Sequence, residues 1–207
     1  MPQQFVDLAT YTDPATRGRA RRLLAQALTV DRTVRWIAND PGAVAGLAGE
    51  LARVHLSQLL RLGRVWILTD GPEVTGLLAG IHPLDERKPG AIADYEEAVA
   101  RATGQYVNRY VIQSRRHGDT KERLPAHFHL THLAIEEPGR GLTAALLERL
   151  HQQLDPLGVP CYTTALGSAS LTTAHRLGYE AHGHPEGEPR IIGLWRSAPE
   201  FTPNGRA

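Results

Sequence analysis

The segment that most constrains this chain is a strand-like run that leads through a glycine loop into a helix. Residues 133–135 read Leu-Ala-Ile, residues 136–141 form a Glu/Pro/Gly loop, and an apolar stripe of helical spacing follows at Leu142, Ala145, Leu146 and Leu150. The first amides of a helix are unpaired and partly positive, and glycines let a phosphate approach them closely. The segment therefore predicts a phosphate-binding helix start, although a tight turn before a capped helix would use the same letters.

Helices and strands alternate along the rest of the chain. Asp-Pro pairs at 13–14 and 40–41 predict two helix starts, because Asp caps a helix and Pro fits its first position. Two apolar runs around a Gly-Pro turn predict a β-hairpin over 65–81. Helices are expected near 92–102 and 168–177, and strands at 127–135, 159–166 and 191–195. This order indicates an α/β or α+β fold, taken as one domain over 1–207 with an insertion at about 82–126.

The amino-acid composition argues against several classes of function. The 23 basic residues nearly balance the 22 acidic ones, so no dominant electrostatic binding to nucleic acid or to an anionic membrane is expected. Cys161 is the single cysteine, which rules out an intramolecular disulfide and cysteine-based metal clusters within one chain. We expect this cysteine to be an inert core residue, and the protein to be cytoplasmic. No apolar run reaches the length of a membrane span.

The motifs of residues 127–196 resemble the GNAT superfamily of acetyl-CoA-dependent N-acetyltransferases. Leu133-Ala134-Ile135, Pro138-Gly139-Arg140-Gly141-Leu142-Thr143 and Arg176-Leu177-Gly178-Tyr179 stand where that family has Leu-Ala-Val, Gln/Arg-x-x-Gly-x-Gly/Ala and Arg-x-Gly-Phe. The resemblance implies a mixed, mostly antiparallel sheet flanked by helices. It also implies an acyl-CoA site where strand 127–135 splays from strand 159–166.

The resemblance further implies which groups hold acetyl-CoA, the expected cosubstrate. Backbone groups of Leu133 and Ile135 would pair with the pantetheine arm, and an amide near Leu133 and Ala134 would stabilise the thioester oxyanion. Ser170 falls where an asparagine often contacts the cofactor. The pyrophosphate would lie on the amides of Gly139, Arg140, Gly141, Leu142, Thr143 and Ala144. An amine of a small molecule or a protein would attack the acetyl group directly, with no metal.

The acceptor amine must lose a proton, and three residues are candidate bases. A neutral imidazole suits this role, which favours His127 and His129. Strand alternation predicts that these two share one face and that His132 faces the other way. Glu136, just past the strand, could act through water. Of the three, His129 lies nearer the expected acetyl position, although packing or surface roles would also suit these histidines.

Two other functions fit parts of the sequence. The tyrosine that commonly protonates the leaving thiolate in this family falls on Ala174, which suits a weak or inactive acyl-CoA-binding sensor; His175 beside it is a possible replacement acid. Residues 127–132, His-Phe-His-Leu-Thr-His, resemble the H-x-H-x-D-H run of metallo-β-lactamase-type hydrolases, with Thr131 in the aspartate position. The acceptor, the acyl chain length and the choice between monomer and homodimer stay open.

Overall fold

The computed structural model describes residues 3–11, 13–83, 91–121, 124–137, 141–165, 168–182 and 192–199. The described strands form one seven-stranded sheet in the order β1-β2-β3-β4-β5-β7-β6. Their bounds are β1 Gln4–Asp7, β2 Arg64–Asp70, β3 Glu73–Ile81, β4 Phe128–Ile135, β5 Cys161–Ala165, β6 Glu180–His182 and β7 Ile192–Arg196. The β4–β5 pair is parallel and each of the other pairs is antiparallel. The expected mixed, mostly antiparallel sheet is confirmed.

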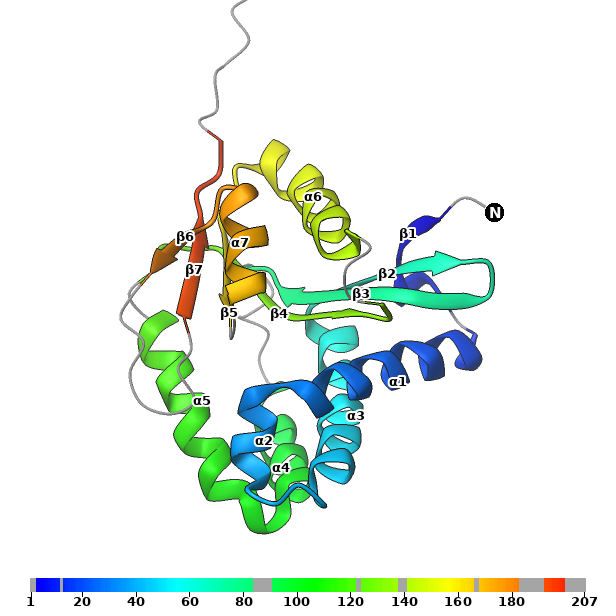
Figure 1. Ribbon diagram of the computed structural model, residues 1–207, viewed down its shortest axis with the longest axis vertical. Coiled ribbons are helices and arrows are strands. Elements are labelled where there is room, and N and C mark those ends of the chain that lie inside the picture. The colour runs from blue at the N-terminus through cyan, green and yellow to red at the C-terminus, as the bar shows by residue number, and fades with distance from the viewer. Residues whose placement is uncertain are drawn as a thin grey trace, which may run out of the picture.

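Helices cover both faces of this sheet (Figure 1). One face carries α6 and α7, and the other carries α1 to α3 with α4 and α5 outside them. Their bounds are α1 Pro14–Val30, α2 Arg32–Ala38, α3 Val44–Leu62, α4 Ala91–Thr103, α5 Val107–Lys121, α6 Leu142–Leu154 and α7 Ser168–Arg176. Among the described helices, none is both long and apolar enough to cross a membrane.

Each face of the sheet has its own apolar core. Under α1 and α3, Leu24, Leu51 and Leu77 are at most 1% exposed. Under α6, the core gathers Leu150 with Phe128 of β4, and both side chains are fully buried. Strand β4 contributes side chains to both cores, because successive side chains of a strand point to opposite faces of the sheet. The face on which each β4 side chain lies therefore determines which helices it contacts.

The helix starts follow from local capping. Asp13 accepts hydrogen bonds from the amides of Ala15 (3.0 Å) and Thr16 (2.9 Å), which confirms the expected start of α1. Asp40 instead accepts from the amide of Gly42 at 2.9 Å and closes a turn, so α3 begins only at Val44. The expected helix start at 40–41 is therefore a few residues early.

Four elements were not anticipated from the sequence: the strands β1 and β6, and the helices α2 and α5. Asp31 begins α2 by accepting hydrogen bonds from the amides of Thr33 (2.7 Å) and Val34 (3.0 Å). In the segment 82–126, α4 packs against α3, and α5 packs against α4 and α2. This segment therefore adds a helical layer outside the face that carries α1 to α3.

Candidate functional site

Strands β4 and β5 pair briefly and then diverge. Their parallel register joins Phe128 to Cys161 and His129 to Tyr162, and no later pair is present among the described residues. Beyond it, the Thr163 hydroxyl donates to the Leu130 carbonyl at 3.0 Å. Strand β4 continues along β3, while β5 continues along β7 (Figure 1). The two strands thus separate as the resemblance to the GNAT superfamily implied.

A β-bulge lies in β4 just where the strands separate. His132 pairs with Ala79 and Leu130 pairs with Gly80, so Thr131 is an extra residue. The Thr131 hydroxyl donates to the Ala79 carbonyl at 3.1 Å. A Cβ on Gly80 would lie 2.5 Å from both the Phe128 ring and the His129 carbonyl oxygen, so the close approach at this point requires glycine.

The amides and carbonyls of β4 after the bulge point alternately toward β3 and away from it. Beyond the bulge, the amide of Glu136 donates to the Thr75 carbonyl of β3 at 2.9 Å. Backbone groups that face one neighbouring strand alternate along an antiparallel ladder. Counting back from Glu136 in the printed register, Ala134 faces β3, whereas Leu133 and Ile135 direct their amides and carbonyls toward the gap beside β5. This is the orientation that the expected pantetheine contacts need, and of the two amides expected near the oxyanion, that of Leu133 faces the gap and that of Ala134 faces β3.

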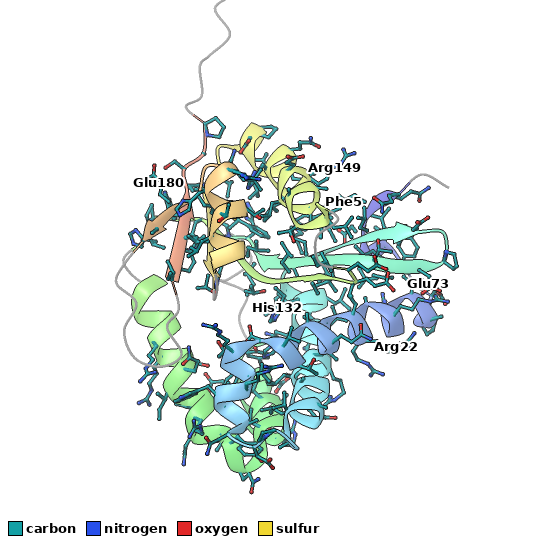
Figure 2. The ribbon with its side chains drawn as sticks, viewed as in Figure 1. Phe5, Arg22, Glu73, His132, Arg149 and Glu180 are labelled. Atoms are coloured by element: carbon teal, nitrogen blue, oxygen red, sulfur yellow. The ribbon has the colours of Figure 1, made fainter. Side chains whose placement is uncertain are left out.

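The bulge turns His132 around. The prediction that His132 faces away from His127 and His129 is wrong, because the extra residue reverses the alternation after Leu130. The His132 ring stacks on His55 of α3, with ring centroids 5.0 Å apart and an interplanar angle of 19°. Figure 2 shows His132 between the sheet and the helices on that face. His129 and His132 of β4, together with His127 just before the strand, therefore lie on the face opposite α6.

The candidate bases differ in their surroundings. His127 is 6% exposed, and its Nδ1 donates to the Pro125 carbonyl at 2.7 Å, so this ring is held within the packing. His129 is half-buried, with its ring centroid 5.5 Å from that of Tyr162, at the last β4–β5 pair before the strands separate. Glu136 is exposed just past the end of β4. By position, His129 is nearest to the opening.

The start of α6 lies at the end of the same loop. Gly141 is its N-cap, with φ +72° and no side-chain cap, and its carbonyl accepts from the amide of Ala145 at 3.0 Å. The amides of residues 142–144 precede the first intrahelical bond and are those that an anion would meet. Leu142 is buried, and Thr143 and Ala144 are half-buried. Gly139 and Arg140 lie outside the described residues, as does the side chain of Ser170 in α7.

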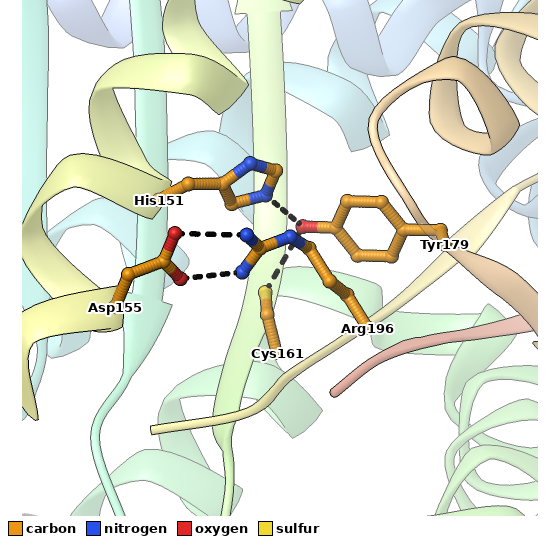
Figure 3. Close-up of polar contacts among 5 residues, drawn as sticks. All are labelled: His151, Asp155, Cys161, Tyr179 and Arg196. Carbon is orange, nitrogen blue, oxygen red and sulfur yellow. Dashed lines mark hydrogen bonds and ion pairs between the residues drawn. The ribbon is translucent and has the colours of Figure 1, made fainter. Parts of the chain in front are cut away.

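A buried polar cluster lies beneath α6 and α7 (Figure 3). The Tyr179 hydroxyl donates to Cys161 Sγ at 3.2 Å, and His151 Nε2 lies 3.0 Å from the same hydroxyl. Asp155 accepts two hydrogen bonds from Arg196, at 2.6 and 2.8 Å. Burial raises the pKa of the Cys161 thiol to about 12, so the thiol stays protonated and unreactive, as expected.

The position of the family's tyrosine is part of the core. Ala174 is 5% exposed and packs with the apolar side chains under α7. The neighbouring His175 is exposed, and its Nδ1 donates to the Tyr179 carbonyl at 2.8 Å, which ties this ring to the end of α7. Within the described part of the chain, no three His, Cys, Asp or Glu side chains are grouped so that they could hold a metal ion.

Sequence reasoning missed three residues beside His132. His55 Nε2 lies 3.5 Å from the Tyr110 hydroxyl of α5, and the His55 ring also lies 6.2 Å from that of Tyr95 of α4. Burial lowers the pKa of His55 to about 3 and that of His132 to about 4, so both rings are neutral at pH 7. One feature of the sequence indicated that His55 faces the interior: it follows Leu51 by one helical turn, on the buried face of α3.

No protein-family model and no curated protein matches the sequence. The structure, in contrast, matches an acetyltransferase from Corynebacterium glutamicum, described as histone acetyltransferase HPA2 and related, with a TM-score of 0.66. That match has 18% identity and covers 98% of this chain and 99% of the other. The chain has the GNAT fold.

Two further solved structures share this fold over nearly the whole chain. A polyamine N-acetyltransferase from Drosophila melanogaster, which forms N-acetylagmatine, has 14% identity and a TM-score of 0.61. A mosquito arylalkylamine N-acetyltransferase like 5b has 17% identity and a TM-score of 0.62. Both matches cover 94% of this chain and 100% of the other. At these identities the GNAT fold is shared, and the activity has to be argued from the site.

Proposed function

We propose that this protein is an acyl-CoA-dependent N-acyltransferase that moves an acetyl group from acetyl-CoA to an amine. The observation that carries the proposal is the divergence of β4 from β5 beside the uncapped start of α6. The gap offers the backbone groups of Leu133 and Ile135 to a pantetheine arm, and α6 offers its first amides to the pyrophosphate. Together these groups suit a nucleotide thioester, which is long, extended and negatively charged at one end.

The residues at the gap suit direct attack by the amine. The Leu133 amide would donate to the carbonyl oxygen of the thioester and stabilise the negative charge that develops there. With Ala174 in the core, no tyrosine at that position protonates the leaving thiolate, but a thiolate with a pKa of about 8.5 is a tolerable leaving group without help. The GNAT N-acetyltransferases with the same fold support the choice of reaction.

Turnover tests this proposal. Purified protein is incubated with acetyl-CoA and a primary amine, with agmatine and 2-phenylethylamine as the probes, and the released CoA thiol is measured. The buried Cys161 contributes little background to a thiol assay on folded protein. We expect CoA release that depends on the amine, with an N-acetylated product of matching mass. A protein that binds acetyl-CoA but releases no CoA with any primary amine of a panel would contradict the proposal. That result would favour the sensor.

A further inference from the structure

A row of polar rings joins β4 to the helices beyond the sheet. His132 of β4 stacks on His55 of α3 at 5.0 Å, and His55 Nε2 lies 3.5 Å from the hydroxyl of Tyr110 on α5. Tyr95 of α4 lies 6.2 Å from the His55 ring. Figure 2 shows His132 on the side of the sheet that faces these helices. None of these four side chains is used by the roles assigned so far.

Polar atoms that lack partners lie on two of the helices that contribute to this row. His55 Nδ1 and both amide atoms of Gln113 are buried without a hydrogen-bond partner among the described residues. Gln113 is 3% exposed and follows Tyr110 by three residues, which places both on neighbouring positions of one α5 face. Unpartnered buried polar groups are costly, and a folded protein keeps them where water or a polar ligand completes them. This interior therefore suits a substrate-facing site better than a dry core.

We propose that His132 takes the proton from the attacking amine and that His55 is its positioning residue. The proposal rests on the proposed acyltransferase function. His132 immediately precedes Leu133, whose amide faces the gap, and its side chain lies on the face opposite α6. An acceptor that approaches from that face would meet the acetyl carbon beside Leu133 and the imidazole of His132.

The surroundings of His132 keep its ring neutral. Among the described residues, the titratable groups whose rings lie against the His132–His55 pair are Tyr95 of α4 and Tyr110 of α5, and His129 lies earlier on β4. Helix α1, which also packs against β4, faces this side with apolar residues. Burial lowers the pKa of His132, so its imidazole can accept a proton throughout the neutral range.

His132 accepts the proton after the amine has attacked the acetyl carbon. Attack forms the C–N bond and leaves a positive nitrogen, whose proton passes to the His132 imidazole; the C–S bond then breaks and the thiolate of CoA leaves. The imidazolium returns its proton to the thiolate or to solvent. A base with a pKa of about 4 is too weak to deprotonate an alkylammonium before attack. The amine must therefore arrive as the free base.

Variants of the pair test this assignment, with the probe amine that turns over. We expect His132→Gln to lower kcat by about 100-fold, and His55→Phe, which keeps a ring against His132, to lower kcat by about 10-fold. Both should bind acetyl-CoA as the wild type does. A matched His182→Gln variant on the edge strand β6 should leave kcat within about twofold, the spread expected without a catalytic role. Imidazole added to His132→Ala should restore part of kcat.

The pH profile of the wild type gives an independent readout. Because His132 must be neutral and its pKa is lowered, kcat at saturating amine should show no acid limb near pH 6.5, while kcat/KM should follow the free-base fraction of the acceptor. An acid limb of kcat near pH 6.5, or full kcat in His132→Gln with loss in His129→Gln, would overturn the assignment and leave the proposed function standing. A wild type that releases no CoA with any amine would overturn both.

Discussion

Gly80 of β3 lies directly against the ring of Phe128 in β4, beside the bulge and close to the point where β4 separates from β5. A Cβ at Gly80 would lie 2.5 Å from that ring and from the His129 carbonyl oxygen. The Phe128 ring and the His129 carbonyl both belong to β4, so a shift of either would change the β3–β4 register after this point.

Gly80→Ala should therefore cost both stability and binding. Overpacking at a position of this kind costs about 1–3 kcal/mol, and the displaced bulge should weaken acetyl-CoA binding. Urea unfolding and calorimetric titration measure the two effects. The control is Gly46→Ala in α3, where nothing lies within 4 Å and alanine favours the helix by up to about 1 kcal/mol. Equal behaviour of the two variants would show that the close approach at Gly80 does not require glycine.

The Asp155–Arg196 ion pair should matter more than an exposed pair. Its side chains are 29% and 14% exposed, and two hydrogen bonds join them. Asp155→Asn leaves the Arg196 guanidinium partly buried without its counter-ion, at a cost of about 1–3 kcal/mol in unfolding free energy. Glu50→Gln, which breaks the more exposed pair with Arg53, should cost at most about 0.5 kcal/mol. Similar unfolding free energies for the two variants would contradict this ranking.

Stability should fall in mild acid because the surroundings of three fully or partly buried histidines disfavour their protonation. Burial lowers the pKa of His55 to about 3 and those of His132 and His151 to about 4. Below about pH 6.5 the unfolded chain binds protons at these sites and the folded chain does not. Each site then removes about 1.4 kcal/mol of unfolding free energy per pH unit, down to its folded pKa.

Unfolding in urea at pH 7.5 and at pH 5 measures this loss. In His151→Asn, the loss between the two pH values should be smaller by about 2 kcal/mol, because one of the three sites is gone. His182→Gln is the control histidine variant and should keep the full wild-type loss. A wild type as stable at pH 5 as at pH 7.5 would contradict the burial of these rings.

A matched pair of glycines tests the start of α6. Gly141 and Gly158 both have positive φ, +72° and +63°, both have open space at Cβ, and they lie near opposite ends of α6. Asparagine tolerates this conformation better than other side chains and adds bulk without charge. We expect Gly141→Asn to weaken acetyl-CoA binding about 10-fold or more, by obstructing the pyrophosphate, and Gly158→Asn to leave it unchanged, with similar thermal stability. Equal affinities would remove the α6 start from the site.

The sequence predicted the elements whose signals are local. Asp13 with Pro14 begins a helix wherever the following residues are helical, and the hairpin over 65–81 is defined by its turn. The short pieces β1 and β6, of four and three residues, carry too little pattern to be recognised, because pairing with neighbouring strands determines them. Helix α5 is polar over most of its length, so its sequence suggested an exposed segment rather than a layer that covers α2 and α4.

The predicted site consists mainly of backbone groups. The resemblance pointed to Leu133 and Ile135, whose backbone groups face the gap beside β5 in the structure, and their contact with acetyl-CoA stays a prediction. The face of His132 could not be derived, because the bulge lies in the pairing of β4 with β3 and the sequence of β4 alone does not report it. Its partner His55 lies 77 positions earlier in the chain, a separation that no local pattern reports.

The most direct test of this account is a calorimetric titration of the wild-type protein with acetyl-CoA. The divergence of β4 from β5 and the open start of α6 predict saturable one-to-one binding at micromolar affinity, about −8 kcal/mol. Absence of binding at millimolar acetyl-CoA would contradict the site, and with it the proposed acyl transfer.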